Sequence, residues 1–192
     1  MDFLFLPYQF MNTKVKAKLV DAAGFSRTIT RMAHEIIERN RGTEHLGIIG
    51  MQTRGAYIAH RVAAKIREIE NIDVPVGILD ATLYRDDYRT SLRQPSVQQT
   101  EIPFDLYDVN VVLVDDVLYT GRTVRAALEA IMDHGRPKRV QLAVMVDRGH
   151  RELPIKPDFI GKNVPTSINE EVQVHMTEVD EEDAIYLVEV EK

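Results

Sequence analysis

Two adjacent acids and a hydroxyl-rich turn lie close together in the middle of the chain. Asp115 and Asp116 are followed after a short interval by Thr120-Gly121-Arg122-Thr123. Carboxylates accept hydrogen bonds from vicinal hydroxyls and help to place a hydrated divalent cation. Hydroxyls, an arginine and unpaired backbone N–H groups can donate to an anion. A ligand that carries a diol beside a phosphate, such as a ribose 5-phosphate, would use both groups.

A strand and a helix are expected to position these residues. Val111 to Val114 form a continuous β-branched and leucine run, which is typical of a strand buried on both faces of a parallel sheet and is expected to end at the two acids. After the turn, Val124, Ala127, Leu128 and Ile131 recur at helical spacing. The turn would therefore stand at a helix N-terminus, where free N–H groups and the helix dipole attract a phosphate. Gly121 would let the backbone approach that phosphate closely.

Val111 to Thr123 resembles the ribose-phosphate-binding signature of the type I phosphoribosyltransferases. The resemblance implies that the two acids hold the ribose 2′ and 3′ hydroxyls and that the turn holds the 5′-phosphate. The implied ribose-phosphate residues are Asp115, Asp116, Val117, Leu118, Tyr119, Thr120, Gly121, Arg122 and Thr123. The plainer alternative is a strand-to-helix connection in which Thr or Asp only caps the helix. A P-loop is excluded, because no glycine-rich loop ends in Lys-Ser or Lys-Thr.

A second strand-loop-helix unit precedes this one. A short strand from Leu46 to Gly50 leads into Thr53-Arg54-Gly55, and a helix is expected from about Ala56 to Glu70, with Ile69 on its inward face. By the same resemblance, this loop cradles pyrophosphate. The residues implied for pyrophosphate are Thr53, Arg54, Gly55, Arg85 and Arg89, the last two from a mobile hood, and those implied in catalysis are Asp115, Asp116, Arg54 and Arg85.

Length and composition favour one cytoplasmic domain. The chain has 192 residues, 44% of them hydrophobic, and no cysteine, which makes a reducing compartment the expectation. No stretch is long enough to span a membrane. We expect an N-terminal extension over residues 1–16 and a single phosphoribosyltransferase domain over residues 17–192. The net charge of -6 is uneven: residues 166–192 carry nine acids and one lysine, whereas the remainder is slightly basic.

The remaining elements complete an α/β fold. A helix is expected from Ser26 to Asn40, with Ser26 as its cap and Gly42 at its end, and strands from Val74 to Leu83 and from Val140 to Val146. Two alternating runs near the C-terminus suggest a closing hairpin or an edge strand. The expected architecture is the type I phosphoribosyltransferase fold: a mostly parallel sheet flanked by helices, with a mobile hood loop and a C-terminal β addition.

Longer segments narrow the resemblance. RMAHEIIERN, TLYRDD, VDDVLYTGRTVRAALEA, LAVMVDRGHRELPI and IGKNVPTS are similar to the family of bifunctional pyrimidine operon regulators and uracil phosphoribosyltransferases. The resemblance implies transfer from 5-phosphoribosyl 1-diphosphate to uracil, giving UMP and diphosphate. It implies Mg²⁺ bound mainly through substrate rather than by protein ligands, and a homodimer or larger homo-oligomer. It also implies binding of a pyrimidine-operon leader mRNA stem-loop and transcription attenuation in response to UMP.

The same resemblance assigns two further sets of residues. Uracil is expected at Asp147, Arg148 and Val172, and leader RNA at Thr30, Arg31, His34, Arg39, His150, Lys156 and Lys162. Without the family, the polar face of the first helix reads as an ordinary solvated surface. Two other functions stay open: a binding module that keeps UMP and RNA recognition but turns over poorly, and a transferase for another base, since purine and orotate enzymes share the central motif.

Overall fold

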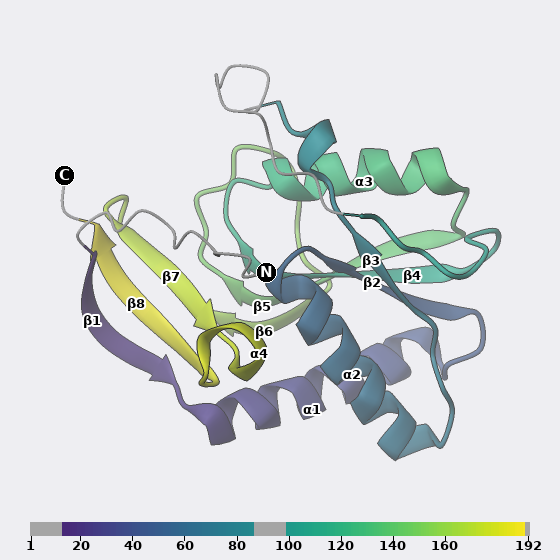
Figure 1. The fold of residues 1–192 in the computed structure, drawn as a ribbon, viewed down its shortest axis with the longest axis horizontal. Helices are drawn as coiled ribbons and strands as arrows, with labels where there is room; N and C mark the ends of the chain where they lie inside the picture. Colours follow the sequence, from purple (N-terminus) through teal and green to yellow (C-terminus); the bar gives the residue numbers. More distant parts are fainter. Residues whose placement is uncertain (1–12, 87–98, 191–192) are drawn as a thin grey trace, which may run out of the picture.

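A five-stranded parallel sheet forms the body of the molecule. The computed structural model describes residues 13–86 and 99–190, and in that part of the chain the sheet has the order β3-β2-β4-β5-β6. Helices α1 and α2 lie on one side of this sheet and α3 lies on the other (Figure 1). The elements of the body are β2 Leu46–Met51, β3 Val76–Leu79, β4 Asn110–Leu118, β5 Arg139–Asp147, β6 Phe159–Asn163, α1 Ala22–Asn40, α2 Arg54–Glu70, α3 Arg122–His134 and the short 3-10 helix η1 Thr82–Tyr84.

The first helix begins earlier than its apolar pattern predicted. Asp21, not Ser26, is the N-cap of α1, and its side chain accepts the N–H of Gly24 at 2.8 Å. At the other end Arg41 takes the left-handed conformation, and the N–H groups of Arg41 and Gly42 donate to the carbonyls of Glu38 and Ile37. The expectation that Ser26 caps this helix was therefore wrong. An N-cap needs only an acceptor near the first free N–H groups, so Asp21 could cap the helix from a position ahead of the apolar stripe.

Strand boundaries differ from expectation at three places. β4 does not end at the acids but continues through them to Leu118. β3 covers only the middle of the expected strand, because the chain turns into η1 at Thr82. β6 was not expected as a strand, and it forms the edge of the sheet beside β5. The expectation that Ile69 faces inward was wrong, because its side chain is exposed near the end of α2.

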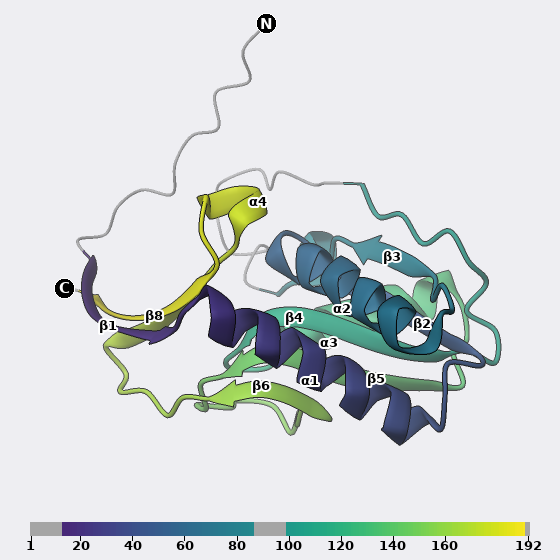
Figure 2. The ribbon, with the colours of Figure 1, turned by 90° about the horizontal axis from the view of Figure 1, so that it is seen from below.

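The C-terminal β addition is part of a second, three-stranded antiparallel sheet. Its order is β1-β8-β7, from β1 Thr13–Val20, β7 Glu170–His175 and β8 Ala184–Val190, with α4 Thr177–Asp180 between β7 and β8. Figure 2 shows β1 and β8 beside the start of α1. The expected boundary between an extension and the domain, at residues 16 and 17, falls inside β1.

Strand β4 separates two apolar cores. Val112 and Val114 pack in the core beneath α1 and α2, whereas Val111 and Leu113 pack in the core beneath α3. This alternation follows from the period of two along a strand. The carboxyl end of β4 therefore emerges between the helix layers, which is where parallel α/β sheets bind ligands.

No helix among residues 13–86 and 99–190 is long and apolar enough to cross a membrane.

Candidate nucleotide-binding site

A cavity opens beside the carboxyl end of β4 and the start of α3. Its volume is about 290 Å³. Asp115 comes from the strand, and the following turn supplies most of the wall. The lining residues are Arg85, Asp115, Val117, Leu118, Tyr119, Thr120, Gly121, Arg122, Thr123 and Val124. Asp116 aside, the structure brings together all the residues expected to hold ribose phosphate.

The two acids differ in environment. Both acids belong to β4, and the charge of the Asp116 carboxylate acts on Asp115. Asp115 lines the cavity and is 8% exposed, whereas Asp116 is half-buried. Burial first, and then the neighbouring charge of Asp116, raise the pKa of Asp115 well above its ordinary value. Asp115 also accepts the N–H of Asp116 at 2.9 Å, which fixes the orientation of its carboxyl group.

The turn after β4 directs backbone toward the cavity. Gly121 is the N-cap of α3 and has a φ of 91°, in the left-handed region that favours glycine. The Thr120 carbonyl accepts the N–H groups of Glu152 and Leu153, which ties the turn to the loop after β5. The first N–H groups of α3 therefore meet the cavity at the positive end of a 13-residue helix.

Arginine side chains contribute unequally to this cavity. Arg85 and Thr123 both line the cavity, and Arg85 donates to the Thr123 hydroxyl at 3.2 Å. The Arg122 side chain instead forms ion pairs with Asp86 at 2.7 Å and Glu152 at 2.6 Å. Those carboxylates compete with any anion for the Arg122 guanidinium, so the backbone at Arg122 is the better donor. Arg89 lies outside the described residues, as does most of the expected hood.

The second expected anion loop lies against β4. An ideal Cβ placed on Gly55 would stand 2.5 Å from the Val114 carbonyl oxygen and 3.1 Å from the Asp115 Cα. Only a glycine permits this approach of α2 to the strand that carries the acids. The Gln52–Thr53 peptide just before it is cis. Arg54 donates to both carboxylate oxygens of Asp180, at 2.7 and 3.1 Å.

The residues expected to bind uracil lie beyond the cavity wall. Arg148 is 7% exposed, and its guanidinium carbon stands 4.1 Å from the centroid of the Tyr119 ring. It also donates to the Glu170 carbonyl and to the Thr166 hydroxyl. Asp147 binds the side chain of Arg151, and Val172 is buried in β7. Tyr119, which was expected in the ribose-phosphate set, lines the cavity, and the Arg148 guanidinium packs on its ring.

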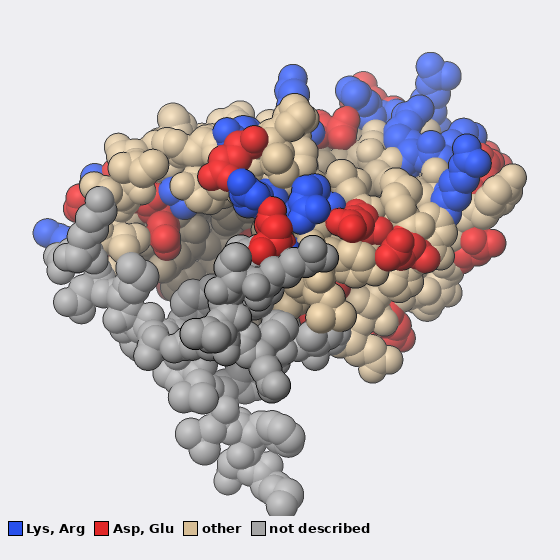
Figure 3. Space-filling view, turned by 90° about the horizontal axis from the view of Figure 1, so that it is seen from above, with Lys and Arg blue, Asp and Glu red and all other residues tan. Residues whose placement is uncertain are grey.

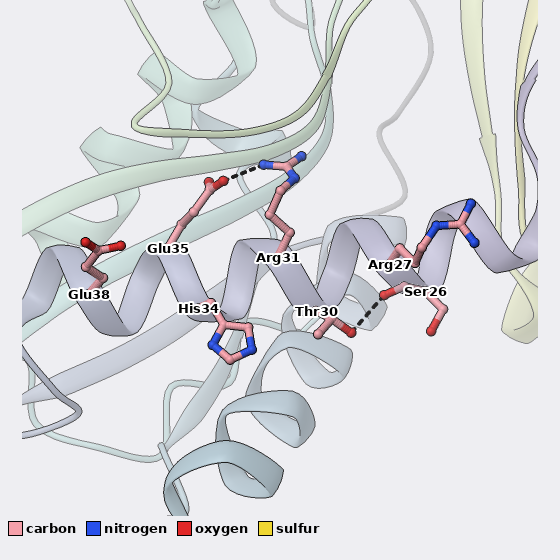
Figure 4. A pocket seen from close by; sticks show the side chains of 7 residues that line it. All are labelled: Ser26, Arg27, Thr30, Arg31, His34, Glu35 and Glu38. Atoms are coloured by element: carbon pink, nitrogen blue, oxygen red, sulfur yellow. Dashed lines mark hydrogen bonds and ion pairs between the residues drawn. The ribbon is translucent and has the colours of Figure 1, made fainter.

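Four of the expected RNA residues gather on α1 and β6. Thr30, Arg31 and His34 line a hollow of about 430 Å³ along α1, and Figure 4 shows Arg31 and His34 on different sides of the helix. Arg31 donates to the carbonyls of Ile160 and Gly161 in β6 and pairs with Glu35 at 2.6 Å. A neighbouring hollow of about 700 Å³ contains both Arg31 and Lys162.

The other expected RNA residues occupy separate positions. His150 lies beside the cavity at β4, with its ring 6.0 Å from Tyr119 and its Nε2 2.6 Å from the Thr166 carbonyl oxygen. Arg39 lies at the far end of α1 and approaches Asp158 at 3.6 Å. Lys156 belongs to the loop before β6.

Sequence reasoning missed the ion pairs between the acidic tail and α2. Arg61 binds Glu178 at 2.6 Å and Asp183 at 2.8 Å, and Arg54 binds Asp180. The excess of acids near the C-terminus indicated that ion pairs could form there, but it did not show which basic residues would bind them. Figure 3 likewise shows acidic and basic side chains next to one another on one face of the molecule.

The donor set fits a cation that is held mainly by substrate. Within the described ranges, no group of three or more His, Cys, Asp or Glu side chains could hold a metal ion. Asp115 and Asp116 nevertheless offer carboxylate oxygens, which Mg²⁺ prefers, and Mg²⁺ commonly completes its octahedron with water and substrate phosphates.

Comparison with known proteins identifies the family. Residues 17–178 match the phosphoribosyl transferase domain. A protein from Pelotomaculum thermopropionicum named bifunctional protein PyrR is 59% identical over 174 residues, which cover 91% of this chain and 96% of that protein. Bifunctional protein PyrR of Thermus aquaticus is 58% identical, covering 93% and 98%, and that of Deinococcus radiodurans is 55% identical, covering 93% and 98%.

Solved structures agree on the fold. A hypoxanthine phosphoribosyltransferase from Staphylococcus aureus superimposes with a TM-score of 0.66 at 15% identity, covering 92% of this chain and 93% of that one. A Trypanosoma cruzi hypoxanthine phosphoribosyl transferase gives a TM-score of 0.69 at 16% identity, covering 94% and 93%. At such identities the likeness concerns architecture, and it confirms the type I fold expected from the sequence.

Proposed function

The chain belongs to the phosphoribosyltransferase family, and from this premise we propose that it is a uracil phosphoribosyltransferase that also regulates pyrimidine-operon transcription. It would convert uracil and 5-phosphoribosyl 1-diphosphate to UMP and diphosphate. It would also bind leader mRNA and attenuate transcription when UMP is abundant. The observation that carries this proposal is 55–59% identity to proteins named bifunctional protein PyrR over more than nine-tenths of the chain.

The cavity beside β4 supports the sugar-phosphate assignment. Its wall joins a buried carboxyl group, Asp115, to the first turn of α3. The diol of a ribose would donate to the acids while the 5′-phosphate accepts N–H groups from the turn. Thr120 and Thr123 would add hydroxyl donors, and Arg85, which donates to Thr123, would face the diphosphate.

The reaction needs electrostatic help at two positions. As diphosphate leaves the anomeric carbon, positive charge grows on the ribose ring and negative charge on the leaving group. Asp115 and Asp116 would stabilise the ring, and Arg54 and Arg85 the leaving group, together with Thr53 and Gly55. Mg²⁺, placed by the two acids and the substrate oxygens, would supply further positive charge to the diphosphate when bound.

The base would lie against Tyr119, which separates the cavity from Arg148. Its ring packs on the guanidinium of Arg148, and Arg148 is anchored to β7 through the Glu170 carbonyl. Asp147, Arg148 and Val172 would then shape the uracil end of the site through Tyr119 and the backbone rather than by direct side-chain contact alone.

The RNA surface would include the hollow between α1 and β6. Arg31 and Lys162 both line it, and Arg27 joins them there. Basic side chains around a concave surface suit an RNA loop with its phosphates and unstacked bases. Thr30, His34 and Arg39 would extend this surface along α1, and His150 and Lys156 would contribute from the segment between β5 and β6. A homodimer or larger homo-oligomer is proposed from the family resemblance.

Base competition tests the transferase half. UMP formation should be followed from uracil and 5-phosphoribosyl 1-diphosphate, with hypoxanthine and orotate as competing bases. We expect uracil to be the only base that is converted. We expect Asp115→Asn and Asp116→Asn to lose this turnover, because asparagine keeps the shape of aspartate but cannot carry a negative charge near the ribose ring. Turnover with another base, or full activity in both variants, would contradict the proposal.

Salt titration of RNA binding tests the regulatory half. Arg31→Ala should weaken leader RNA binding and reduce the slope of affinity against salt by about one phosphate contact, while UMP formation is unchanged. Arg67→Ala is the matched control, since Arg67 is an exposed arginine at the end of α2 that pairs with Asp73. Equal loss in both variants, or equal affinity for an unrelated hairpin, would refute a specific RNA surface at α1.

A further inference from the structure

The arginine of the second anion loop has a fixed acidic partner. Nε and Nη2 of Arg54 both donate to Asp180, so the guanidinium is bound along one edge. Asp180 is itself held, because it also accepts the Met176 N–H at 3.0 Å. The pair is half-buried, with side-chain exposures of 32% for Arg54 and 17% for Asp180. Because Asp180 is held by the Met176 N–H and binds two nitrogens of Arg54, the pair restrains the orientation of the Arg54 guanidinium more than a loose surface ion pair would.

The segment around α4 has a second anchor on α2 besides Asp180. Arg61, two turns further along α2, binds Glu178 and Asp183 from the same segment. Asp183 also accepts the backbone N–H and the hydroxyl of Thr177, at the start of α4. The segment is therefore anchored to α2 independently, which leaves the Asp180 contact available for another role.

The restrained arginine stands next to the reaction site. Arg54 is the first residue of α2, and the following Gly55 lies against the backbone of Val114 and Asp115. A guanidinium bound at two atoms keeps one orientation, whereas an arginine side chain without such a restraint samples many rotamers. Fixing it before the substrate arrives removes an entropy cost from binding.

We propose that Asp180 is a positioning residue for phosphoribosyl transfer, which orients Arg54 toward the diphosphate of 5-phosphoribosyl 1-diphosphate. The inference rests on the proposed function, because the pyrophosphate role of Arg54 belongs to it. Asp180 itself does not touch the substrate. Its charge and geometry act through Arg54, so its loss should affect diphosphate binding and leave uracil binding unchanged.

Two neutralising substitutions on the same short helix test the proposal. Asp180→Asn removes the carboxylate that binds Arg54, and Glu178→Gln removes one that binds Arg61 instead. Both change the charge of α4 equally. We expect Asp180→Asn to raise KM for 5-phosphoribosyl 1-diphosphate by about 3- to 10-fold, the cost of ordering one long side chain, with KM for uracil unchanged. Glu178→Gln should leave both constants unchanged.

Arg54→Ala separates this inference from the proposed function. If Arg54→Ala leaves kcat/KM for the diphosphate substrate unchanged, the pyrophosphate role of Arg54 is wrong. If it lowers kcat/KM while Asp180→Asn has no effect, only the positioning role is wrong. A lower KM in Asp180→Asn, which would mean that Asp180 competes with diphosphate, overturns it too. In the double variant, Asp180→Asn should add less than about 2-fold to the effect of Arg54→Ala.

Discussion

Gly55→Ala should damage stability and substrate binding together. The new Cβ would lie 2.5 Å from the Val114 carbonyl oxygen and 3.1 Å from the Asp115 Cα, where ordinary contacts are 3.4–4 Å. Both atoms belong to the main chain of β4, which pairs with β2 on one side and β5 on the other. Neither neighbour can rotate away as a flexible side chain would, so α2 must move.

The expected loss follows from this overlap. Forcing an extra carbon into a packed interior costs about 1–3 kcal/mol. For a domain of this size each kcal/mol lowers Tm by roughly 2–4 °C, so we expect a decrease of about 2–12 °C. Displacing the start of α2 also displaces Arg54, and misplacement by about 1 Å can cost on the order of 100-fold in rate. Thermal melting and kcat/KM for 5-phosphoribosyl 1-diphosphate measure the two effects.

Gly24→Ala is the matched control. Gly24 also lies in the first turn of a long helix, α1, but its Cβ would meet the ends of side chains, Val20 at 3.0 Å and Asp21 at 3.1 Å. The Val20 side chain and the Asp21 cap need to move by only a few tenths of an ångström, and alanine favours a helix over glycine by about 1 kcal/mol. We expect its Tm to change by less than that of Gly55→Ala and its kinetics not at all. Equal Tm values for the two variants would refute the reasoning from main-chain overlap.

Two further predictions concern charged residues. Burial and the charge of Asp116 raise the pKa of Asp115, so its contribution to stability is present below the ordinary carboxyl pKa and is lost as pH rises through the raised folded value. Asp115→Asn cannot ionise, so in Mg²⁺-free buffer Tm of the variant relative to wild type should increase with pH across that window; parallel curves would contradict this. Arg61→Gln should loosen α4, because it removes the partner of Glu178 and Asp183. Hydrogen exchange of the α4 amides should then accelerate, and unchanged protection would argue against the anchor.

The local elements could be read from the sequence because each has a local cause. The apolar run Val111–Val114 specifies a buried strand, and helical spacing after Gly121 specifies the start of α3. The two acids and the turn therefore had to lie at one end of a parallel strand. The end of β4 and the cap of α1 were misjudged, because polar residues within strands and ahead of apolar stripes carry no periodic signal.

Tertiary structure alone decided which side chains remain available to a ligand. Residues far apart along the chain meet only when the chain folds. The ion pairs of Arg122 with Asp86 and Glu152, and of Arg54 with Asp180, therefore left no signal in the sequence. Ion-pair partners depend on distances of a few ångströms, and composition records only the sum of charges. The sequence thus determined the kinds of groups and the strand end that carries them. The packing of α4 on α2, and of the loop after β5 on the turn, determined their directions, because those contacts join segments that no local pattern connects.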